Sequence, residues 1–237
     1  MLHFMFGEQE KEQNEALTDT YTFMDQFADA MVRRIKGGQD TTNKLRKFEI
    51  WTRGLRSSLM ELEQSQFAAS RFKERIKSAS VDGMSGEERL NYERYVYFDK
   101  NSFIRVFSLL DKLGTLLNEL LDMKTEKVKP HFSYFTVLRH MRERNAHPDL
   151  TWKLSAIKEQ YKEPMNRLRK RRNTEIHYMN SEMQDDLIQN QRMYGEQIPL
   201  ENLSLQADDL AACLVMSIES LRLTFQYACV LMRNKTV

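Results

Sequence analysis

Apolar residues recur along most of the chain at alternating steps of three and four, and this spacing constrains the fold more than any other feature. The first stripe comprises Leu17, Tyr21, Met24, Ala28, Met31 and Ile35. Comparable stripes lie within 48–62, 103–120, 150–168 and 214–232. This period places each stripe on one face of an α-helix, and we find no convincing two-residue alternation typical of strands. The pattern predicts an all-α protein.

Few helix-breaking residues interrupt these stripes. The 237 residues include 8 Gly and 4 Pro, well below the roughly 12% that is usual for the two together. Most breakers lie between stripes, in Gly37-Gly38, Asp82–Gly86, Lys129-Pro130 and His147-Pro148. Pro164 falls inside the 150–168 stripe and predicts a kink there. We therefore predict an up-and-down bundle of about five to seven long helices, with a shorter helix at 133–144.

The length is suited to one helical domain spanning residues 1–237. It begins with an acidic N-terminal helix at 8–36 and ends with a long helix. A polar stretch at 181–204, which contains Gly195 and Pro199, reads as a long connection before that last helix.

The last helix and the cysteines favour a cytoplasmic protein without a membrane segment. The most apolar stretch, 210–232, contains Glu219 and Arg222, and charged residues at mid-span are costly in lipid. It is therefore interpreted as a buried helix. Two cysteines cannot form a disulfide framework, so Cys213 and Cys229 are interpreted as reduced core residues.

The net charge of +2 conceals strong segregation of charge. Residues 8–30 carry seven acids and one lysine, and residues 173–220 carry nine acids and one arginine. Between them, residues 167–172 read Arg-Leu-Arg-Lys-Arg-Arg. This run is either a solvated helix face or a surface that contacts phosphates, because clustered Lys and Arg gain affinity by releasing counterions.

The basic run leads into Arg172-Asn173-Thr174-Glu175-Ile176-His177, where four residues separate Arg from His and a polar Asn follows the Arg. This segment resembles the Arg-x4-6-His motif of the HEPN superfamily. The resemblance implies an all-α bundle, frequent homodimerisation and, in many members, a metal-independent RNA endonuclease activity. Family members include toxins of toxin–antitoxin pairs and abortive-infection proteins. The resemblance thus implies no cofactor and no metal, RNA as a partner, and a protein antitoxin as a further partner.

The motif supplies the groups that metal-free RNA cleavage requires. The reaction needs a base for the 2′-OH proton, an acid for the leaving 5′-oxygen and a cation for the phosphorane. His177 would serve as acid or base, Arg172 as the phosphate-binding cation and Asn173 as an orienting group. A twofold dimer would bring two copies of His177 together. Four further cations would hold the RNA backbone: Arg167, Arg169, Lys170 and Arg171.

Helical geometry qualifies this arrangement. Asn173 and His177 are four residues apart and share a face on a regular helix. Arg172 lies about 140° away, and would have to reach across or sit at a helix break with Asn173 as its N-cap. Alternatively, His177 is a hydrogen-bonded core residue and Arg172 an ordinary surface cation.

Two other readings of the sequence are kept open. A non-catalytic helical module that binds RNA or a protein is one, and the acidic arm at 8–30 would suit a basic partner. A metal-binding bundle built on His140, Glu143 and His147 is the other, although the paired Glu-x-x-His of di-iron bundles is absent. Arg142 and His147 also match the bare Arg-to-His spacing, but Glu143 and Pro148 follow them, so this pair ranks lower.

Overall fold

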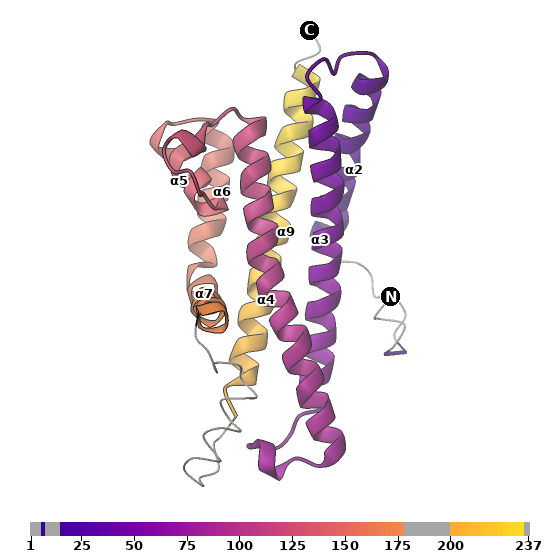
Figure 1. Ribbon diagram of the computed structural model, residues 1–237, viewed down its shortest axis with the longest axis vertical. Coiled ribbons are helices and arrows are strands. Elements are labelled where there is room, and N and C mark those ends of the chain that lie inside the picture. Colours follow the sequence, from indigo (N-terminus) through magenta and orange to yellow (C-terminus); the bar gives the residue numbers. More distant parts are fainter. Residues whose placement is uncertain (1–5, 8–14, 178–199, 235–237) are drawn as a thin grey trace. The chain divides into compact units, whose positions relative to one another are not determined.

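The fold, taken from a computed structural model, is described for residues 6–7, 15–177 and 200–234 (Figure 1). Within these residues it contains only helices, which confirms the predicted all-α class. The α-helices are α2 (Glu15–Lys36), α3 (Lys44–Lys73), α4 (Gly86–Leu120), α5 (Tyr134–Glu143), α6 (Pro148–Gln160), α7 (Lys162–His177) and α9 (Leu203–Asn234). Two 3-10 turns, η1 (Val81–Gly83) and η2 (Thr125–Lys127), lie between them.

The chain forms two compact units. Unit 1 comprises 1–9, 62–105 and 162–214, and unit 2 comprises 10–61, 106–161 and 215–237. The helices α3, α4 and α9 each contribute one part to each unit. The sequence-based description of 1–237 as one helical domain therefore remains a prediction, and each unit is described by itself.

In unit 2, α2 and the first part of α3 run side by side in opposite directions (Figure 1). Gly38, with a φ of +73°, closes α2, because the left-handed region suits glycine. The carboxylate of Asp40 accepts hydrogen bonds from the backbone N–H groups of Leu45 and Arg46, at 2.9 and 3.0 Å. It thereby satisfies donors at the start of α3.

A glycine brings α4 and α5 into close contact within unit 2. A Cβ on Gly114 would lie 2.7 Å from the Cα of Tyr134, the first residue of α5. Ser133 and Thr136 form a capping box that begins α5 at this point. The Tyr134 ring is fully buried and its hydroxyl donates to Ser220 at 3.3 Å. Burial raises the pKa of Tyr134 to about 12.

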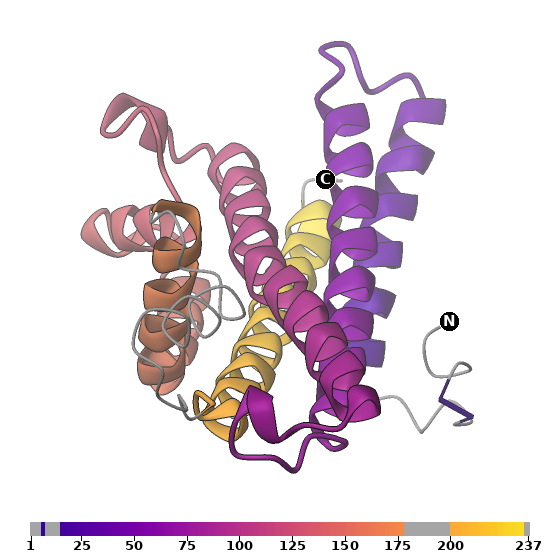
Figure 2. The same cartoon turned by 60° about the horizontal axis from the view of Figure 1, so that its bottom comes forward.

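Unit 1 is organised around aromatic residues of α3 and α4. Its core comprises Ala68, Ala69, Phe72, Tyr92, Tyr95, Val96 and Leu203. The rings of Phe72 and Phe98 stack with their centroids 5.7 Å apart. The connection from α3 to α4, brought forward in Figure 2, is closed by the Glu88 carboxylate, which accepts a hydrogen bond from the Ser78 N–H at 2.6 Å. Such bonds lower the pKa of Glu88.

The helix boundaries show where the chain is interrupted near Pro164, and they leave other predictions outside the described residues. Near the predicted kink at Pro164, the helix is interrupted for one residue at Tyr161, between α6 and α7. Pro164 lies in the first turn of α7, where helix N–H groups have no partner and proline is tolerated. Residues 8–14 of the acidic arm and 181–199 of the predicted connection lie outside the described residues.

Of the described helices, α9 alone is long and apolar enough to cross a membrane by length and composition. Half of its most apolar window is nevertheless buried inside the structure. Glu219 and Arg222, within this stretch, form an ion pair at 2.7 Å. These features are those of a core helix in a bundle, the interpretation given to the sequence.

Candidate functional site on helix α7

The basic run and the motif lie on one continuous helix. Lys, Arg and Glu, which favour helices, fill much of α7, and Glu163 in its first turn complements the helix dipole. Met165 and Leu168 are buried and anchor one side. His177 is the last helical residue. Because the helix is unbroken at Asn173, the reading of this residue as an N-cap is wrong.

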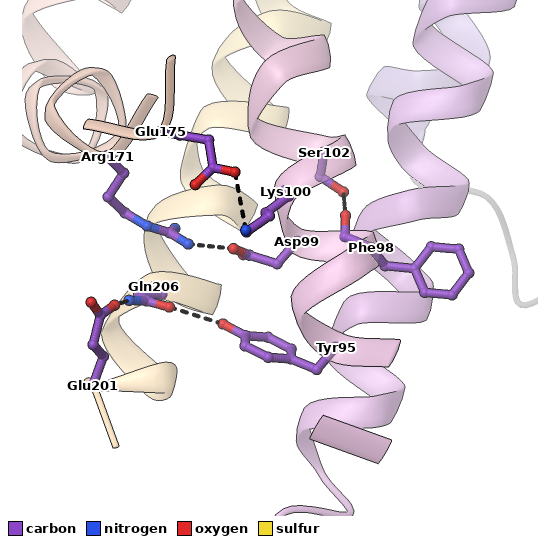
Figure 3. Close-up of polar contacts among 9 residues, drawn as sticks. All are labelled: Tyr95, Phe98, Asp99, Lys100, Ser102, Arg171, Glu175, Glu201 and Gln206. Carbon is purple, nitrogen blue, oxygen red and sulfur yellow. Dashed lines mark hydrogen bonds and ion pairs between the residues drawn. The ribbon is translucent and has the colours of Figure 1, made fainter. Parts of the chain in front are cut away.

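One face of α7 is held by three ion pairs spaced four residues apart. Arg167 binds the Asp209 carboxylate of α9 with two hydrogen bonds, of 2.8 and 2.6 Å. Figure 3 shows the other two, in which Arg171 pairs with Asp99 and Glu175 pairs with Lys100 at 3.0 Å, both partners lying on α4. This ion-pair face, residues 167, 171 and 175, fixes the orientation of α7 within unit 1.

The central pair is buried. Asp99 is fully shielded from solvent, and the Arg171 side chain is 18% exposed. Burial raises the pKa of Asp99, while the Arg171 guanidinium opposes that shift. Arg171 also lies over the Phe103 ring, 5.1 Å from its centroid, a favourable cation–π geometry. Removing either partner would leave a buried charge without compensation, which is strongly destabilising.

Another face of α7 carries mostly exposed polar side chains. It is formed by Asn166, Arg169, Lys170, Asn173 and Thr174, which together line a shallow depression in unit 1. Position 177 continues the same stripe, because it follows Asn173 by four residues. We call residues 166, 169, 170, 173 and 174 the open face. It presents two cations and two amides, groups that donate hydrogen bonds to phosphate oxygens.

Arg172 points elsewhere. Its position follows Leu168 by four residues and Met165 by seven, so it continues the buried stripe. Its side chain is partly buried, and its Nε atom is enclosed. Among the predicted catalytic residues, the structure thus places Asn173 and position 177 on one face, and Arg172 about 140° around the helix.

A family model described as Cthe2314-like HEPN matches residues 51–229, about three quarters of the chain. The chain belongs to this HEPN family. The match includes all of α4 to α7 and the motif segment, and begins after α2. Among curated proteins and solved structures, no match was found.

Within this HEPN domain, the structure separates the four cations predicted to hold RNA. Arg169 and Lys170 lie on the open face. Arg167 and Arg171 lie on the ion-pair face, and the hydrogen bond with Asp209 raises the pKa of Arg167. The Arg171 guanidinium is therefore engaged by the buried Asp99, whereas the Arg167 side chain is 44% exposed and keeps part of its surface in solvent.

The residues that hold α7 were missed in the sequence, although one signal was present. Asp99 follows Tyr95 by four residues and precedes Phe103 by four, so it occupies the apolar stripe of α4. A carboxylate in such a stripe indicates a buried ion pair. Below it, the Tyr95 hydroxyl donates to Gln206 at 3.2 Å, and Gln206 donates in turn to Glu201 (Figure 3).

The lower-ranked candidates have other partners in the HEPN domain. The Nδ1 atom of His147 lies 2.7 Å from the Tyr227 hydroxyl, and His147 precedes α6 in a left-handed conformation. His140 lies on α5, which ends at Glu143, so the two histidines do not share a helix as the metal-site reading required. Among the described residues, no group of three His, Cys, Asp or Glu is arranged to hold a metal ion.

The cysteines agree with their interpretation as core residues. Cys213 is fully buried, and burial raises the pKa of its thiol to about 12. Cys229 is partly buried, and its pKa is also raised by burial. Such thiols remain protonated at neutral pH and are poor nucleophiles.

Proposed function

We propose that this HEPN domain is a metal-independent RNA endonuclease that acts as a homodimer, of the toxin or abortive-infection type. The observation that carries the proposal is the open face of α7. There Asn173 lies beside Arg169 and Lys170, on the stripe that position 177 continues. Groups that can donate hydrogen bonds to phosphates and motif position 177 thus share one side of a helix that lies within the family match.

The chemistry requires two proton-transfer groups. In the proposed reaction, one His177 removes the proton of a ribose 2′-OH, and the 2′-oxygen attacks the adjacent phosphorus. The bond to the 5′-oxygen then breaks, and the second His177 of the dimer donates a proton to that oxygen. The products are a 2′,3′-cyclic phosphate and a 5′-hydroxyl. Each chain supplies one motif histidine, so a twofold dimer supplies both acid and base.

Arg172 keeps in this proposal the role that the motif gives it, but acts from a less direct position. Because its position lies about 140° from position 177 on the helix, it reaches the phosphorane only by extending around α7. We assign it to charge stabilisation of the transition state, and Asn173 to orientation of the scissile phosphate. Arg169 and Lys170 hold the flanking backbone, with a contribution from the exposed part of Arg167.

The decisive experiment compares wild type with His177→Ala on tRNA and mRNA in the presence of EDTA. Wild type should cleave, and His177→Ala should lose activity by at least about a hundredfold, the usual contribution of a general acid or base. His131→Ala is the matched control, because His131 is an exposed histidine outside the motif. A product with a cyclic phosphate terminus and a dimer mass in light scattering would complete the assignment.

The second candidate is a non-catalytic helical module that binds RNA or a protein. The ion-pair face favours it, because Arg167 and Arg171 of the basic run already serve the packing of α7. Absence of cleavage by wild type at high protein concentration would support this candidate. Toxicity on expression that is relieved by His177→Ala would contradict it.

A further inference from the structure

A second basic surface lies in unit 2, on the hairpin of α5 and α6. A pocket there is lined by four cations: Lys129, Arg139, Arg142 and Lys158. No carboxylate belongs to the described residues that line it. The surrounding segment, 124–158, has eight Lys and Arg against three Asp and Glu. The cations come from three separate stretches of chain, which the fold brings together.

The cations of this pocket are available to a ligand. In the described part of the chain, Lys129 and Arg142 have no ion-pair partner. Arg139 lies 3.9 Å from Glu143, and both side chains are 60% exposed. Lys158 lies 3.4 Å from Glu159, again at the surface. Exposed pairs of this kind are weak and screened by salt, so a phosphate can displace them.

An exposed tryptophan lies on α6 about one helical turn from a residue that lines the pocket. Trp152 is 73% exposed on α6 and precedes the pocket residue Ser155 by three positions, so the two are surface neighbours on the helix. Trp51, by contrast, is partly buried and has the Lys47 Nζ atom 5.1 Å from its ring. An exposed indole beside clustered cations is the combination by which proteins bind single-stranded nucleic acid, through base stacking and phosphate contacts.

We propose that Trp152 and this pocket form a second binding site for single-stranded RNA. The four cations contact successive phosphates, and Trp152 stacks on a base. The choice of RNA over another polyanion rests on the proposed function, but the site does not depend on the motif on α7. It would hold the strand independently of the step that cleaves it.

The test uses full-length protein and a 2′-O-methyl oligoribonucleotide, which lacks the attacking 2′-OH and cannot be cleaved. With Trp51→Phe, Trp152 is the remaining tryptophan, and its fluorescence should be quenched on binding. In anisotropy titrations, Trp152→Ala should weaken binding at least about fivefold. Arg142→Glu should weaken it about tenfold and reduce the slope of log affinity against log salt by about 0.7.

Arg46→Glu is the matched control, because Arg46 is an exposed arginine of unit 2 on α3. The proposal is overturned if Trp152→Ala and Arg142→Glu bind like this control while Arg169→Glu weakens binding. It is also overturned if Trp152→Ala changes the oligomeric mass and leaves RNA affinity unchanged, because the surface then joins protein chains. Quenching of Trp152 by RNA in a protein that cleaves nothing would support this site and refute the nuclease.

Discussion

The two basic clusters of the molecule differ in what their cations already contact. On α7 the cations are adjacent in sequence, yet Arg167 and Arg171 bind carboxylates of α9 and α4. On the α5–α6 hairpin the cations are dispersed in sequence, yet Lys129 and Arg142 lack ion-pair partners among the described residues. The density of charge along a chain is therefore a poor guide to the charge that a ligand can reach.

The largest expected effect tests whether the Arg171 guanidinium of the α7 cluster is buried and needs its carboxylate partner. Asp99→Ala should lower the free energy of unfolding by about 3–5 kcal/mol, because it leaves the Arg171 guanidinium buried without its partner. Urea unfolding followed by circular dichroism measures this change. The double variant Asp99→Leu with Arg171→Met should recover most of the loss.

A loss below about 1 kcal/mol for Asp99→Ala would show that Arg171 reaches solvent. The cations of the two basic clusters would then be equally accessible to a ligand, and the difference drawn between the clusters would be wrong. RNA affinity measured on the same variants separates this outcome from unfolding.

The next effect concerns the contact that supports α5, which carries part of the α5–α6 basic cluster. Gly114→Ala should destabilise the protein by about 1–3 kcal/mol, because the added methyl group meets the backbone of Tyr134 at the start of α5. Thermal or urea unfolding gives the value. Gly54→Ala is the control, since nothing lies within 4 Å of a Cβ there, and this helical position should gain up to about 1 kcal/mol. Equal effects at the two sites would contradict the close contact.

The smallest effect is a difference in pH dependence between two carboxylates of α4. Burial raises the pKa of Asp99 above 3.8, so the folded state keeps a proton that the unfolded chain releases. The contribution of Asp99 to stability therefore falls as the pH rises from its ordinary pKa through its raised pKa in the folded state. Hydrogen bonds from Ser78 and Lys77 lower the pKa of Glu88 below 4.5. Stability from Glu88 is present above its ordinary pKa and is lost as the pH falls.

Unfolding of Asp99→Asn and Glu88→Gln, followed across about pH 3–7, measures these slopes. In wild type, Asp99 makes the protein less stable as the pH rises, and Asp99→Asn should abolish this decrease. Glu88 makes the protein more stable as the pH rises, and Glu88→Gln should abolish this increase. Identical profiles for the two variants would place both carboxylates in the same environment.

The fold was predictable from sequence because its information is local. Each apolar stripe specifies one helix face, and the helices α2, α3, α5 and α9 appear where the spacing placed them. Pro164 predicts a disturbance of the helix, but the apolar stripe continues through it and does not show where the helix ends. Here the helix is interrupted at Tyr161 and Pro164 lies in the first turn of the next helix, a boundary that the apolar period does not record.

The candidate site was predictable only in part. The shared face of Asn173 and position 177 follows from helical spacing, and the structure agrees with it. The pairing of Arg171 with Asp99 joins residues 72 positions apart, and such pairing is specified by packing of whole helices. The α5–α6 pocket was missed for the same reason, since its cations lie on three segments whose meeting the sequence pattern does not reveal.

The close contact at Gly114 constrains how α4 can change over evolution. One inserted residue rotates the remainder of a helix by about 100°, so a length change between Asp99 and Gly114 would misplace one of them relative to its contacts. Close-packed interiors absorb such rotations poorly. We therefore expect relatives to vary in length at the 37–43 and 74–85 connections, and to conserve the interval of 15 residues between these two positions of α4.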